Sequence, residues 1–433
     1  MHIRVDERQW ANLSSSLLAE KHLESAGILL GEVIGTGAER VIAVRETKLV
    51  PDDGYEIRRP DQLRISPLTL NRLVRPARER GWSVLTIHTH GAQSPPQFSW
   101  ADDQGDARLM PSFSSLIPGV PHGSMVLSST GEVTARLFDG HADPAFVGIS
   151  VVGRRLQRLV RAEEFDEPWF HRQRLALGGA GQAQLRRLRV AVVGAGGIGS
   201  VVAIELCHLG VGELLLVDGD VLEASNVSRV LASRVADVSR MPKVDLAARY
   251  IVESGLPVRV QVIEEPLNEH NVEALATADV ILSCVDRHRP RALLNRLAYR
   301  ALVPVIDTGT AFRIGVAGQL TGAAGRVVVV GPGRPCLNCW GHISPDALRV
   351  EALPQEERQA LAAEGYVSGA DVPEPSVVAF NAAVASHAVI ELMRLVTGFA
   401  GADDPPDRLA FSFADGTVRR NRLAERHPCA ICA

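Results

Sequence analysis

A buried strand, a glycine-rich turn and a helix follow one another near the middle of this chain, and this feature constrains the fold most strongly. Residues 190–193 (VAVV) predict the strand, and Gly194, Gly196 and Gly199 then match the G-x-G-x-x-G pattern. Glycines in this pattern let backbone N–H groups approach phosphate oxygens at the positive end of a helix. The pattern predicts a nucleotide site, but alone it does not distinguish NAD, FAD and ATP.

Strand and helix patterns alternate after this turn. Strands are predicted at residues 213–217, 258–263, 280–284 and 303–306, and helices at residues 199–209, 272–276 and 289–300. Alternation of this kind implies a parallel sheet with right-handed crossovers. We therefore expect a doubly wound, Rossmann-like α/β domain over residues 188–433.

Charged residues near the ends of these strands indicate which nucleotide binds. Asp218 ends the strand after the glycine turn and is placed to accept hydrogen bonds from a ribose. A triphosphate carries more charge than a dinucleotide, so it needs cations and a carboxylate that holds magnesium. Arg229 and Lys243 supply the cations and Asp286 the carboxylate. Taken singly each is an ordinary surface charge, but their order and spacing favour ATP and Mg²⁺.

Two C-x-x-C pairs predict a closed metal site. The pairs are Cys336 with Cys339 and Cys429 with Cys432. Four thiolates are the ligand set of a tetrahedral structural zinc, with Zn–S distances of about 2.3 Å. The alternative is four unrelated buried thiols. The remaining Cys207 and Cys284 lie in apolar runs and are expected to be reduced core residues, as in a cytoplasmic protein.

A second set of metal ligands is predicted in the N-terminal half, where residues 26–33, 41–45, 84–90 and 124–128 predict strands. His88 and His90 are two apart on a strand, so they share a face and can bind one ion. Ser99 is a good helix N-cap, with Asp102 in the first turn. Two imidazoles and one carboxylate leave a fourth position for water, which is typical of a catalytic zinc. Asp103 is the alternative carboxylate ligand.

Glu24 is the candidate general base for such a site. It precedes the buried strand predicted at residues 26–33. A carboxylate near a zinc-bound water can complete its deprotonation. The alternative is that Glu24 is an ordinary surface glutamate.

The C-terminal part resembles the ubiquitin-activating superfamily that includes the ThiF/MoeB/HesA adenylyltransferases. The matching stretches are HRQ at residues 171–173, GAGGIGS, LLLVDGDVLEASNVSR, MPK, SCVDRH, CLNC and CAIC. The resemblance implies that ATP and the C-terminal glycine carboxylate of a ubiquitin-like protein form an acyl-adenylate and pyrophosphate. It assigns the nucleotide to Gly194, Gly196, Gly197, Gly199, Asp218, Asp220, Asn226, Arg229, Lys243 and Asp286. Of these, Asn226, Arg229 and Lys243 would contact phosphates and Asp286 would hold magnesium, while Arg172 would act across a homodimer interface.

One departure from this family concerns the acceptor. Many relatives carry a nucleophilic cysteine between the first cysteine pair and the following helix, whereas residues 341–375 contain none. We therefore predict an adenylate that passes directly to a thiol, an amine or a sulfur donor of a partner, without an intramolecular thioester.

Residues 10–150 resemble the JAB/MPN (JAMM) metallopeptidases, which cleave after the C-terminal glycine of ubiquitin-like proteins. The resemblance lies in ESAGILLG, HTH and SWAD. It implies Glu24 as general base, His88, His90 and Asp102 as zinc ligands, and Ser99 as a hydrogen-bond donor to the oxyanion. Eight residues separate His90 from Ser99, where the family usually has seven, and Gly91 replaces the usual proline.

The motifs and resemblances together predict three segments. These are an α+β metallopeptidase-like domain at 1–155, a helical connector at 156–187 that contains Arg172, and the adenylation domain at 188–433. The connector is predicted because basic and apolar residues recur at helical spacing at 151–161 and 182–189. The net charge of -4 indicates neither nucleic-acid nor anionic-membrane binding. No secretory signal is evident, so a cytoplasmic enzyme is expected.

The expected function is a bifunctional enzyme that adenylates a Gly-Gly-ending ubiquitin-like carrier and cleaves after that glycine. A conjugating enzyme or a sulfur donor would be its further partner. Three alternatives stay open: a sulfur-carrier adenylyltransferase of thiamin- or molybdopterin-type biosynthesis, an adenylating enzyme with a non-catalytic docking domain, and a dehydrogenase. The sequence leaves open which carrier and acceptor are used, and whether cleavage matures precursors or removes conjugates.

Overall fold

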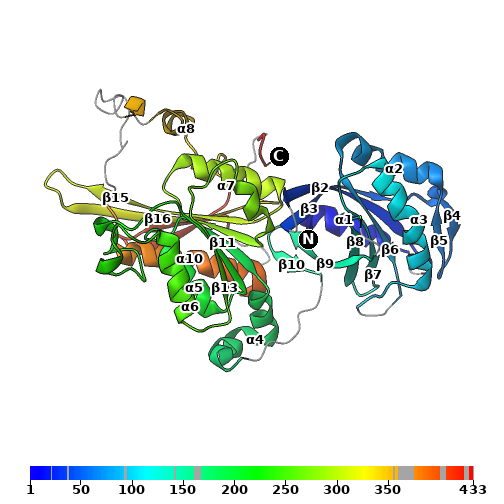
Figure 1. Ribbon diagram of the computed structural model, residues 1–433, viewed down its shortest axis with the longest axis horizontal. Coiled ribbons are helices and arrows are strands. Elements are labelled where there is room, and N and C mark those ends of the chain that lie inside the picture. The colour runs from blue at the N-terminus through cyan, green and yellow to red at the C-terminus, as the bar shows by residue number, and fades with distance from the viewer. Residues whose placement is uncertain are drawn as a thin grey trace. The chain divides into compact units, whose positions relative to one another are not determined.

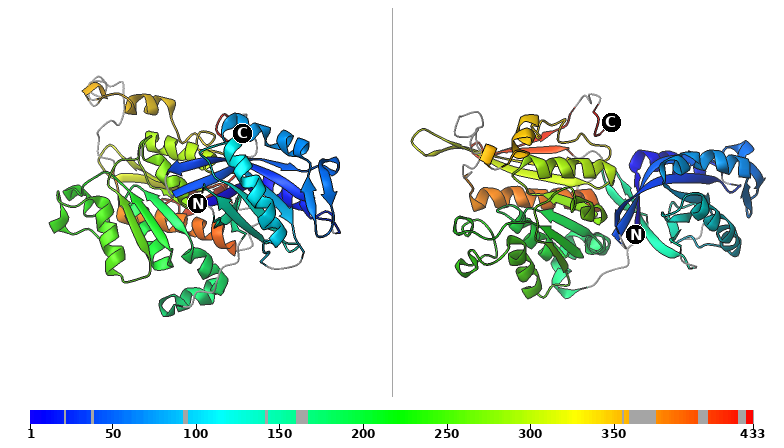
Figure 2. Two further views of the ribbon diagram at one scale, coloured as in Figure 1. Left: turned by 45° about the vertical axis from the view of Figure 1, so that its right-hand side comes forward. Right: turned by 45° about the horizontal axis from the view of Figure 1, so that its top comes forward.

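The structure is a computed structural model of the 433-residue chain, which divides into two compact units, Met1–Ala162 and Glu163–Ala433 (Figures 1 and 2). It describes residues 1–20, 22–36, 39–91, 95–140, 143–159, 167–354, 356–358, 375–399, 406–423 and 429–432. Each unit contains its own sheet.

The N-terminal unit is built on one sheet in the strand order β1-β3-β2-β6-β7-β8-β9-β10. The strands are β1 (His2–Asp6), β2 (Ala26–Thr36), β3 (Glu39–Leu49), β6 (Ser83–Thr89), β7 (His122–Leu127), β8 (Val133–Phe138), β9 (Ala145–Val152) and β10 (Leu156–Arg158). Because β1 pairs with both β3 and β9, the sheet closes on itself. A separate two-stranded sheet is formed by β4 (Tyr55–Arg58) and β5 (Leu63–Ile65), after the 3₁₀ helix η1 (Asp52–Gly54).

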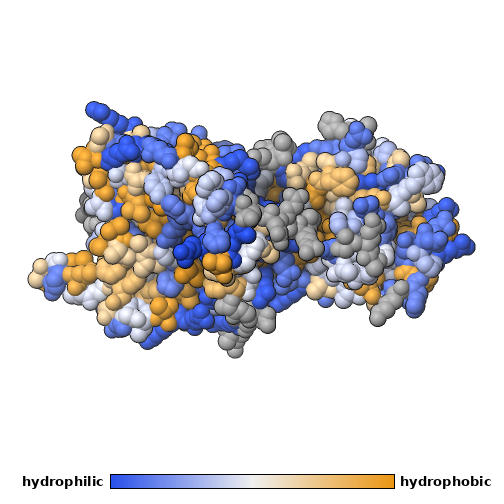
Figure 3. Space-filling view, turned by 90° about the horizontal axis from the view of Figure 1, so that it is seen from below, coloured by the Kyte–Doolittle hydropathy of each residue, from blue (hydrophilic) through white to orange (hydrophobic). Residues whose placement is uncertain are grey.

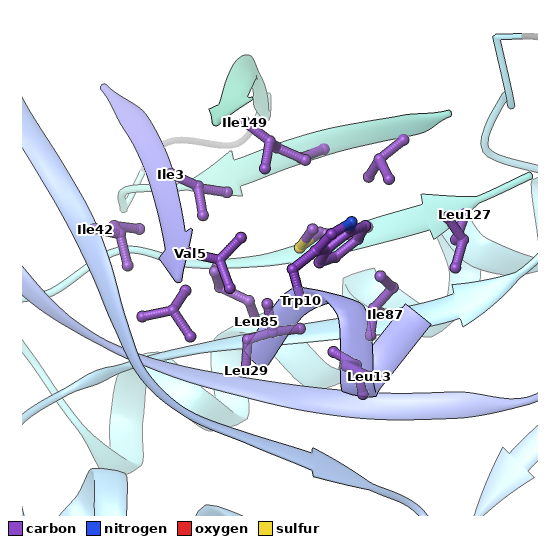
Figure 4. Close-up of a cluster of buried hydrophobic side chains, with 14 of the residues drawn as sticks. Ile3, Val5, Trp10, Leu13, Leu29, Ile42, Leu85, Ile87, Leu127 and Ile149 are labelled. Atoms are coloured by element: carbon purple, nitrogen blue, oxygen red, sulfur yellow. The ribbon is translucent and has the colours of Figure 1, made fainter. Parts of the chain in front are cut away.

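Three helices bury the two faces of this sheet. They are α1 (Glu7–Leu17), α2 (Pro67–Arg80) and α3 (Trp100–Leu116). Side chains on a strand alternate between faces, so Leu29 packs with Trp10 and Leu13 of α1 in one cluster (Figure 4). Its neighbour Ile28 packs in a second cluster, which contains Leu73 of α2 and other residues of α2 and α3. Full burial of one such aliphatic side chain contributes about 1.5–3 kcal/mol.

The C-terminal unit is built on a second sheet in the order β13-β12-β11-β14-β15-β16-β17-β18. The strands are β11 (Arg189–Val193), β12 (Glu213–Val217), β13 (Arg259–Ile263), β14 (Val280–Ser283), β15 (Val305–Ile314), β16 (Leu320–Val330), β17 (Arg408–Ser412) and β18 (Thr417–Asn421). The pairs from β13 to β15 are parallel and the later ones antiparallel. The order reverses between β11 and β14, which makes this edge the expected ligand site.

The helices of this unit cover both faces of the sheet. They are α4 (His171–Arg186), α5 (Gly199–Leu209), α6 (Lys243–Glu253), α7 (His288–Arg300), α8 (Pro345–Glu351) and α10 (Val378–Thr397), with the 3₁₀ helices η2 (Pro168–Phe170), η3 (Ala224–Asn226), η4 (Val235–Asp237) and η5 (Val272–Thr277). α5, α6 and α10 lie on one face and α7 on the other (Figure 1). α4 is kinked at Gly178, whose φ of 72° and ψ of 167° are not helical.

Two apolar features of this unit stand out. α10 is long and apolar enough to cross a membrane, but half of its most apolar window is buried, and it packs against α5 and β15 as a core helix does. The hairpin of β15 and β16 projects from the unit (Figure 1), and its end carries the exposed Ile314, Val316 and Leu320 on a mixed polar and apolar surface (Figure 3).

Most predicted strands are confirmed to within a few residues, and the mixed α/β class is confirmed. The prediction of a helix at 151–161 is wrong: β9 continues to Val152 and β10 spans Leu156–Arg158, so the connector predicted at 156–187 is not helical where it begins. The reason is long-range, because β9 pairs with both β1 and β10. The helix predicted at 272–276 is the 3₁₀ helix η5, and α1 and α2 lie where no helix was predicted.

Candidate functional sites

Three predicted metal ligands meet in the N-terminal unit. His88 Nε2 lies 2.9 Å from Asp102 Oδ1 and 3.0 Å from His90 Nε2, and His90 Nε2 lies 3.4 Å from Asp102 Oδ2. All three ligand atoms lie within 4.8 Å of one another. Two imidazole nitrogens and a carboxylate oxygen at this separation fit one divalent ion, and zinc accepts this donor set.

The position of the two histidines follows from the strand that carries them. In β6, Ile87 points into the apolar cluster around α1, so His88 points to the opposite face. His90 follows the strand, and its backbone N–H donates to the Leu127 carbonyl at 2.8 Å. The end of β6 thus carries both rings toward α3.

Asp102 is held by the start of α3. Ser99 and Asp102 form a capping box: Asp102 N–H donates to Ser99 Oγ at 3.2 Å, and Ser99 N–H donates to Asp102 Oδ2 at 2.6 Å. The Ser99 hydroxyl also donates to Asp102 Oδ2 at 2.8 Å. Ser99 therefore orients the carboxylate of Asp102.

Burial and hydrogen bonding shift the pKa values at this site in opposite directions. Burial disfavours the charged form of Asp102, but hydrogen bonds with His88 and His90 outweigh it and hold its pKa far below the usual range. The hydrogen bond with Asp102 raises the pKa of His90, although burial works against this. The site therefore favours an ionised Asp102 carboxylate and the protonated form of the His90 ring beside it, and a bound cation would take over the charge of that ring.

Glu24 lies at the same site. Ala26 pairs with His88 between β2 and β6, so the residues just before β2 run beside His90. Arg58 fixes this segment, since its Nε donates to the Glu24 carbonyl at 2.9 Å and its guanidinium donates to Ser25 Oγ at 2.8 Å. Burial raises the pKa of the Glu24 carboxyl, while the charges of His88 and His90 act to lower it.

The alternative ligand Asp103 faces a different partner. Its Oδ1 accepts a hydrogen bond of 2.6 Å from Arg136, which also donates to Asp106 Oδ2 at 2.9 Å and stacks over the Phe98 ring at 3.8 Å. Arg136 therefore secures the first turn of α3 and the residues before it. Asp102 is the carboxylate that joins the histidines. The additional loop residue relative to the family spacing lies between His90 and Ser99, where positions 92–94 are outside the described residues.

The glycine turn of the C-terminal unit has the shape that a phosphate loop requires. Gly194 has a φ of 90°, and a Cβ there would lie 2.7 Å from the Cys284 carbonyl oxygen. A Cβ on Gly199 would overlap the Gly194 carbonyl, and one on Gly197 would overlap the Asn381 side chain. Gly196 faces open space. α5 begins here without a side-chain cap, so the positive end of its helix dipole adjoins the turn, which is the setting in which helices bind phosphates.

Asp218 closes this turn from the end of β12. Its Oδ2 accepts a hydrogen bond of 2.6 Å from Ala195 N–H, and its Oδ1 accepts one of 2.8 Å from Asp220 N–H. Burial raises the pKa of Asp218 against these hydrogen bonds and the charge of Lys243. Lys243 Nζ is paired with Asp220 Oδ2 at 2.7 Å.

The remaining predicted phosphate contacts lie around η3. Asn226 is buried, and its amide Nδ2 donates to Ser225 Oγ at 3.1 Å. The guanidinium of Arg229 donates to the Ser225 carbonyl at 2.7 Å, and its Cδ lies 3.5 Å from the position of a Cβ on Gly197. Arg229 therefore borders the glycine turn.

Asp286 and Arg172, the other two residues predicted for the nucleotide site, are both exposed. Asp286 is exposed in the loop after β14, two residues beyond Cys284, whose N–H donates to the Val193 carbonyl at 2.8 Å beside the glycine turn. Arg172 is exposed at the start of α4. Within the described part of the chain, no polar contact joins Arg172 to the glycine turn of the same chain.

The four cysteines of the two C-x-x-C pairs form one cluster. Cys336 Sγ lies 3.7 Å from Cys339 Sγ and 3.6 Å from Cys429 Sγ, and Cys339 Sγ lies 3.6 Å from Cys432 Sγ. A tetrahedron with Zn–S bonds of about 2.3 Å places its sulfurs about 3.8 Å apart, so the cluster fits a structural zinc. Asn295 of α7 supports the loop by accepting a hydrogen bond of 2.9 Å from Leu337 N–H.

The other two cysteines are poor nucleophiles. Burial raises the pKa of the Cys284 thiol to about 12 and also raises that of Cys207. A thiol with a raised pKa carries little reactive thiolate, which agrees with the expectation that neither replaces a catalytic cysteine.

Comparison with known proteins identifies both parts of the chain. Residues 170–431 match the ThiF family, and residues 6–139 match the prokaryotic homologs of the JAB domain. The "Adenylyltransferase and sulfurtransferase uba4" of Aspergillus niger is 30% identical over 263 residues, which are 59% of this chain and 50% of that protein. The "SAMP-activating enzyme E1" of Haloferax volcanii is 33% identical over 171 residues, 39% of this chain and 59% of that protein. The chain thus spans between half and three fifths of the length of these two relatives.

A solved structure shares the fold. The crystal structure of E. coli MccB with MccA-N7isoAsn has a TM-score of 0.50 and 17% identity, and the match covers 63% of this chain and 76% of that one. The two family matches confirm both resemblances seen in the sequence: the chain belongs to the ThiF family and carries a JAB-like domain at its N-terminus.

Proposed function

We propose that this chain adenylates the C-terminal glycine of a ubiquitin-like carrier and also hydrolyses the bond after that glycine. The observation that carries the proposal is the convergence of the glycine turn, Asp218 and the Asp286 loop at the edge where the strand order reverses. Membership of the ThiF family and the match to the JAB domain support it. The two activities would act on the same tail of the carrier.

In the adenylation reaction, the terminal carboxylate of the carrier attacks the α-phosphate of ATP in line and pyrophosphate leaves. Asp218 would accept hydrogen bonds from the ribose, while Asn226 and Arg229 would contact phosphate oxygens. A magnesium ion held by Asp286 would neutralise charge near the α-phosphate. Lys243, which forms an ion pair with Asp220 in the structure, would exchange this partner for a phosphate. Positioning and charge neutralisation suffice for this reaction.

In the cleavage reaction, His88, His90 and Asp102 would hold a zinc ion. That ion would supply Lewis acidity and bring the pKa of a water to about 7. Glu24 would accept a proton at its carboxylate and return it to the leaving nitrogen. Ser99 would donate to the oxyanion only after its hydroxyl leaves Asp102, because its hydroxyl donates a hydrogen bond to the Asp102 carboxylate in the structure.

ATP–pyrophosphate exchange tests the first activity. Wild-type protein, Mg-ATP, labelled pyrophosphate and a panel of small proteins ending in Gly-Gly should exchange label into ATP. Asp286→Ala should lower the exchange rate by about 10²-fold or more, because it removes charge stabilisation beside the reacting phosphate. Asp415→Ala, which removes an exposed carboxylate in the turn between β17 and β18, is the control. Absence of exchange and of ATP binding by the wild type would contradict the proposal.

Cleavage of a carrier with a C-terminal extension tests the second activity. Glu24→Gln should lower the cleavage rate by about 10²–10⁴-fold, the contribution of a positioned general base. Glu20→Gln, an exposed glutamate of the same loop, should cleave like the wild type. If mass spectrometry shows no cleavage by the zinc-loaded wild type, the N-terminal unit is better described as a docking domain for the carrier.

A second candidate function is activation of a sulfur carrier for thiamin- or molybdopterin-type biosynthesis. The name of the Aspergillus niger relative includes a sulfurtransferase, and residues 341–375 contain no cysteine to hold a thioester. A carrier C-terminal thiocarboxylate formed with a persulfide donor would favour this function. An amide formed with a protein amine would favour conjugation, and a reducible adduct on the enzyme itself would contradict direct transfer.

The proposal includes a homodimer, because Arg172 would reach the nucleotide of the partner subunit. Mixing Arg172→Ala protein with Asp286→Ala protein tests this. Two inactive variants should regain exchange in mixed dimers if Arg172 acts across the interface, and should stay inactive if it acts within its own chain.

A further inference from the structure

The helix that follows the Asp286 loop is capped from another part of the unit. α7 begins at His288, and its N-cap residue Arg287 makes no side-chain cap hydrogen bond. Glu351, the last residue of α8, takes this role: its Oε1 accepts from His288 N–H at 2.8 Å and its Oε2 accepts from Arg289 N–H at 2.7 Å. A carboxylate here satisfies two of the N–H groups that a helix start leaves unpaired and is attracted by the helix dipole.

α8 contacts the same point from its other end as well. Ser344 caps α8, accepting from Ala347 N–H at 3.3 Å, and its own N–H donates to His288 Nδ1 at 3.2 Å. α8 follows the first cysteine pair by only a few residues. The segment after the CLNC loop is therefore attached to the first turn of α7 at two positions.

The loop between β14 and α7 is fixed on both sides of Asp286. On the upstream side, the Val285 carbonyl accepts a hydrogen bond of 2.7 Å from Arg291, which is held by Asp307 at 2.9 Å. On the downstream side, the backbone is fixed by Glu351. Asp286 itself is exposed, so the backbone on either side of it decides where its carboxylate lies.

We propose that Glu351 is a positioning residue for the nucleotide site. By fixing the first turn of α7, it holds Asp286 where Mg-ATP requires a carboxylate, and it thereby couples the segment after the first cysteine pair to the adenylation centre. This inference rests on the proposed adenylation function. Nothing in the two family resemblances assigns a role to Glu351.

The experiment compares Glu351→Ala, Glu351→Gln and the control Asp346→Asn, whose carboxylate contacts Arg349 on the exposed side of the same helix. Binding of Mg-ATP is measured across a Mg²⁺ titration, and amide hydrogen exchange is measured for residues 284–289. Glu351→Ala should raise the half-saturating Mg²⁺ concentration about fivefold, as expected for the loss of a helix cap. It should also speed exchange at His288 and Arg289. Glu351→Gln keeps one acceptor oxygen and should show a smaller shift, and Asp346→Asn should show none.

The outcomes separate this inference from the function on which it rests. If Glu351→Ala lowers the melting temperature but leaves the Mg²⁺ half-saturation unchanged, Glu351 only stabilises the fold and the positioning role is refuted. Unchanged amide exchange at His288 and Arg289 refutes the cap itself. If the wild type binds no Mg-ATP, the adenylation proposal fails, while the exchange data still decide whether Glu351 fixes α7.

Discussion

The candidate metal centre of the N-terminal unit and the candidate nucleotide site of the C-terminal unit are built by different means. In the metal centre, side chains contact one another directly, with His88, His90 and Asp102 within 4.8 Å. In the nucleotide site, the backbone provides the shape: Asp218 binds the Ala195 N–H, and the Asp286 carboxylate is exposed. The first site should therefore be sensitive to the loss of single side chains, and the second to changes that deform its backbone.

The largest effect on ligand affinity is expected from a methyl group in the glycine turn. A Cβ on Gly199 would overlap the Gly194 carbonyl, so Gly199→Ala must displace the turn. We expect ATP affinity to fall by about 10²-fold or more and the free energy of unfolding to fall by about 2–4 kcal/mol. Isothermal titration and thermal melting measure both.

Gly196→Ala is the matched control within the same turn. A Cβ on Gly196 meets open space, so the melting temperature should stay near that of the wild type. A loss of ATP binding without loss of stability would place the phosphates against Gly196. A Gly199→Ala protein that binds ATP normally would contradict the view that backbone shape makes this site.

Arg136 provides the corresponding test of the metal centre. Arg136→Met leaves the buried Asp106 carboxylate without its cation and releases Asp103 in the first turn of α3. Unfolding free energy should fall by about 3–5 kcal/mol, because a buried charge loses its partner. Zinc affinity, measured by competition with a chelator, should fall by about 10–100-fold, as for other residues that orient metal ligands.

A second variant separates the two effects. Adding Asp106→Asn to Arg136→Met removes the unpaired charge, so it should restore much of the stability. Zinc affinity should stay low, because the hydrogen bond from Arg136 to Asp103, which fixes the turn that carries Asp102, is still absent. If zinc affinity recovers together with stability, Arg136 acts only through the fold.

The two cysteine pairs allow the structural and catalytic sites to be distinguished by metal content. Wild-type protein should bind two zinc ions, and Cys336→Ser and His88→Ala should each bind one. Loss of the cysteine cluster should lower the unfolding free energy by about 3 kcal/mol, because structural zinc contributes folding energy. His88→Ala should cost less stability, since the capping box still holds α3. Equal melting temperatures for Cys336→Ser and the wild type would contradict the structural role.

The sequence indicated the candidate residues of each site, and Ser99 as the cap that orients Asp102, but not the supporting residues that come from distant parts of the chain. His88, His90, Ser99 and Asp102 lie in short motifs whose spacing follows from strand and helix geometry. Arg136 acts from a strand far along the chain, and so no local pattern marks it. The same limit explains the wrong helix at 151–161.

The C-terminal unit shows the same contrast between residues in local motifs and supporting residues distant in sequence. The glycine turn could be predicted from the sequence because its shape depends on residues that are adjacent in the chain. The cap from Glu351 on α7 joins positions 63 residues apart in sequence, which only the fold brings together. Supporting contacts of this kind carry no sequence signature, whereas ligands grouped by secondary structure do.

The smallest expected effect concerns pH in the metal-free protein. The hydrogen bond with Asp102 raises the pKa of His90 above the ordinary value of 6.5, although burial opposes it. Folding therefore favours the charged ring: this stabilisation is complete below the ordinary pKa and is lost as pH rises through the raised value. Chelator-treated protein should lose about 1 kcal/mol or less over this interval, seen as a falling melting temperature.

Two controls connect this pH dependence to the metal centre. Asp102→Asn should flatten the profile, because the neutral amide no longer raises the pKa of His90. Bound zinc should also remove this decline, since it requires the neutral ring and becomes the stabilising cation itself. If chelated wild type is as flat as Asp102→Asn, the ring–carboxylate contact forms only around the ion, and the metal centre would then be no more preassembled than the nucleotide site.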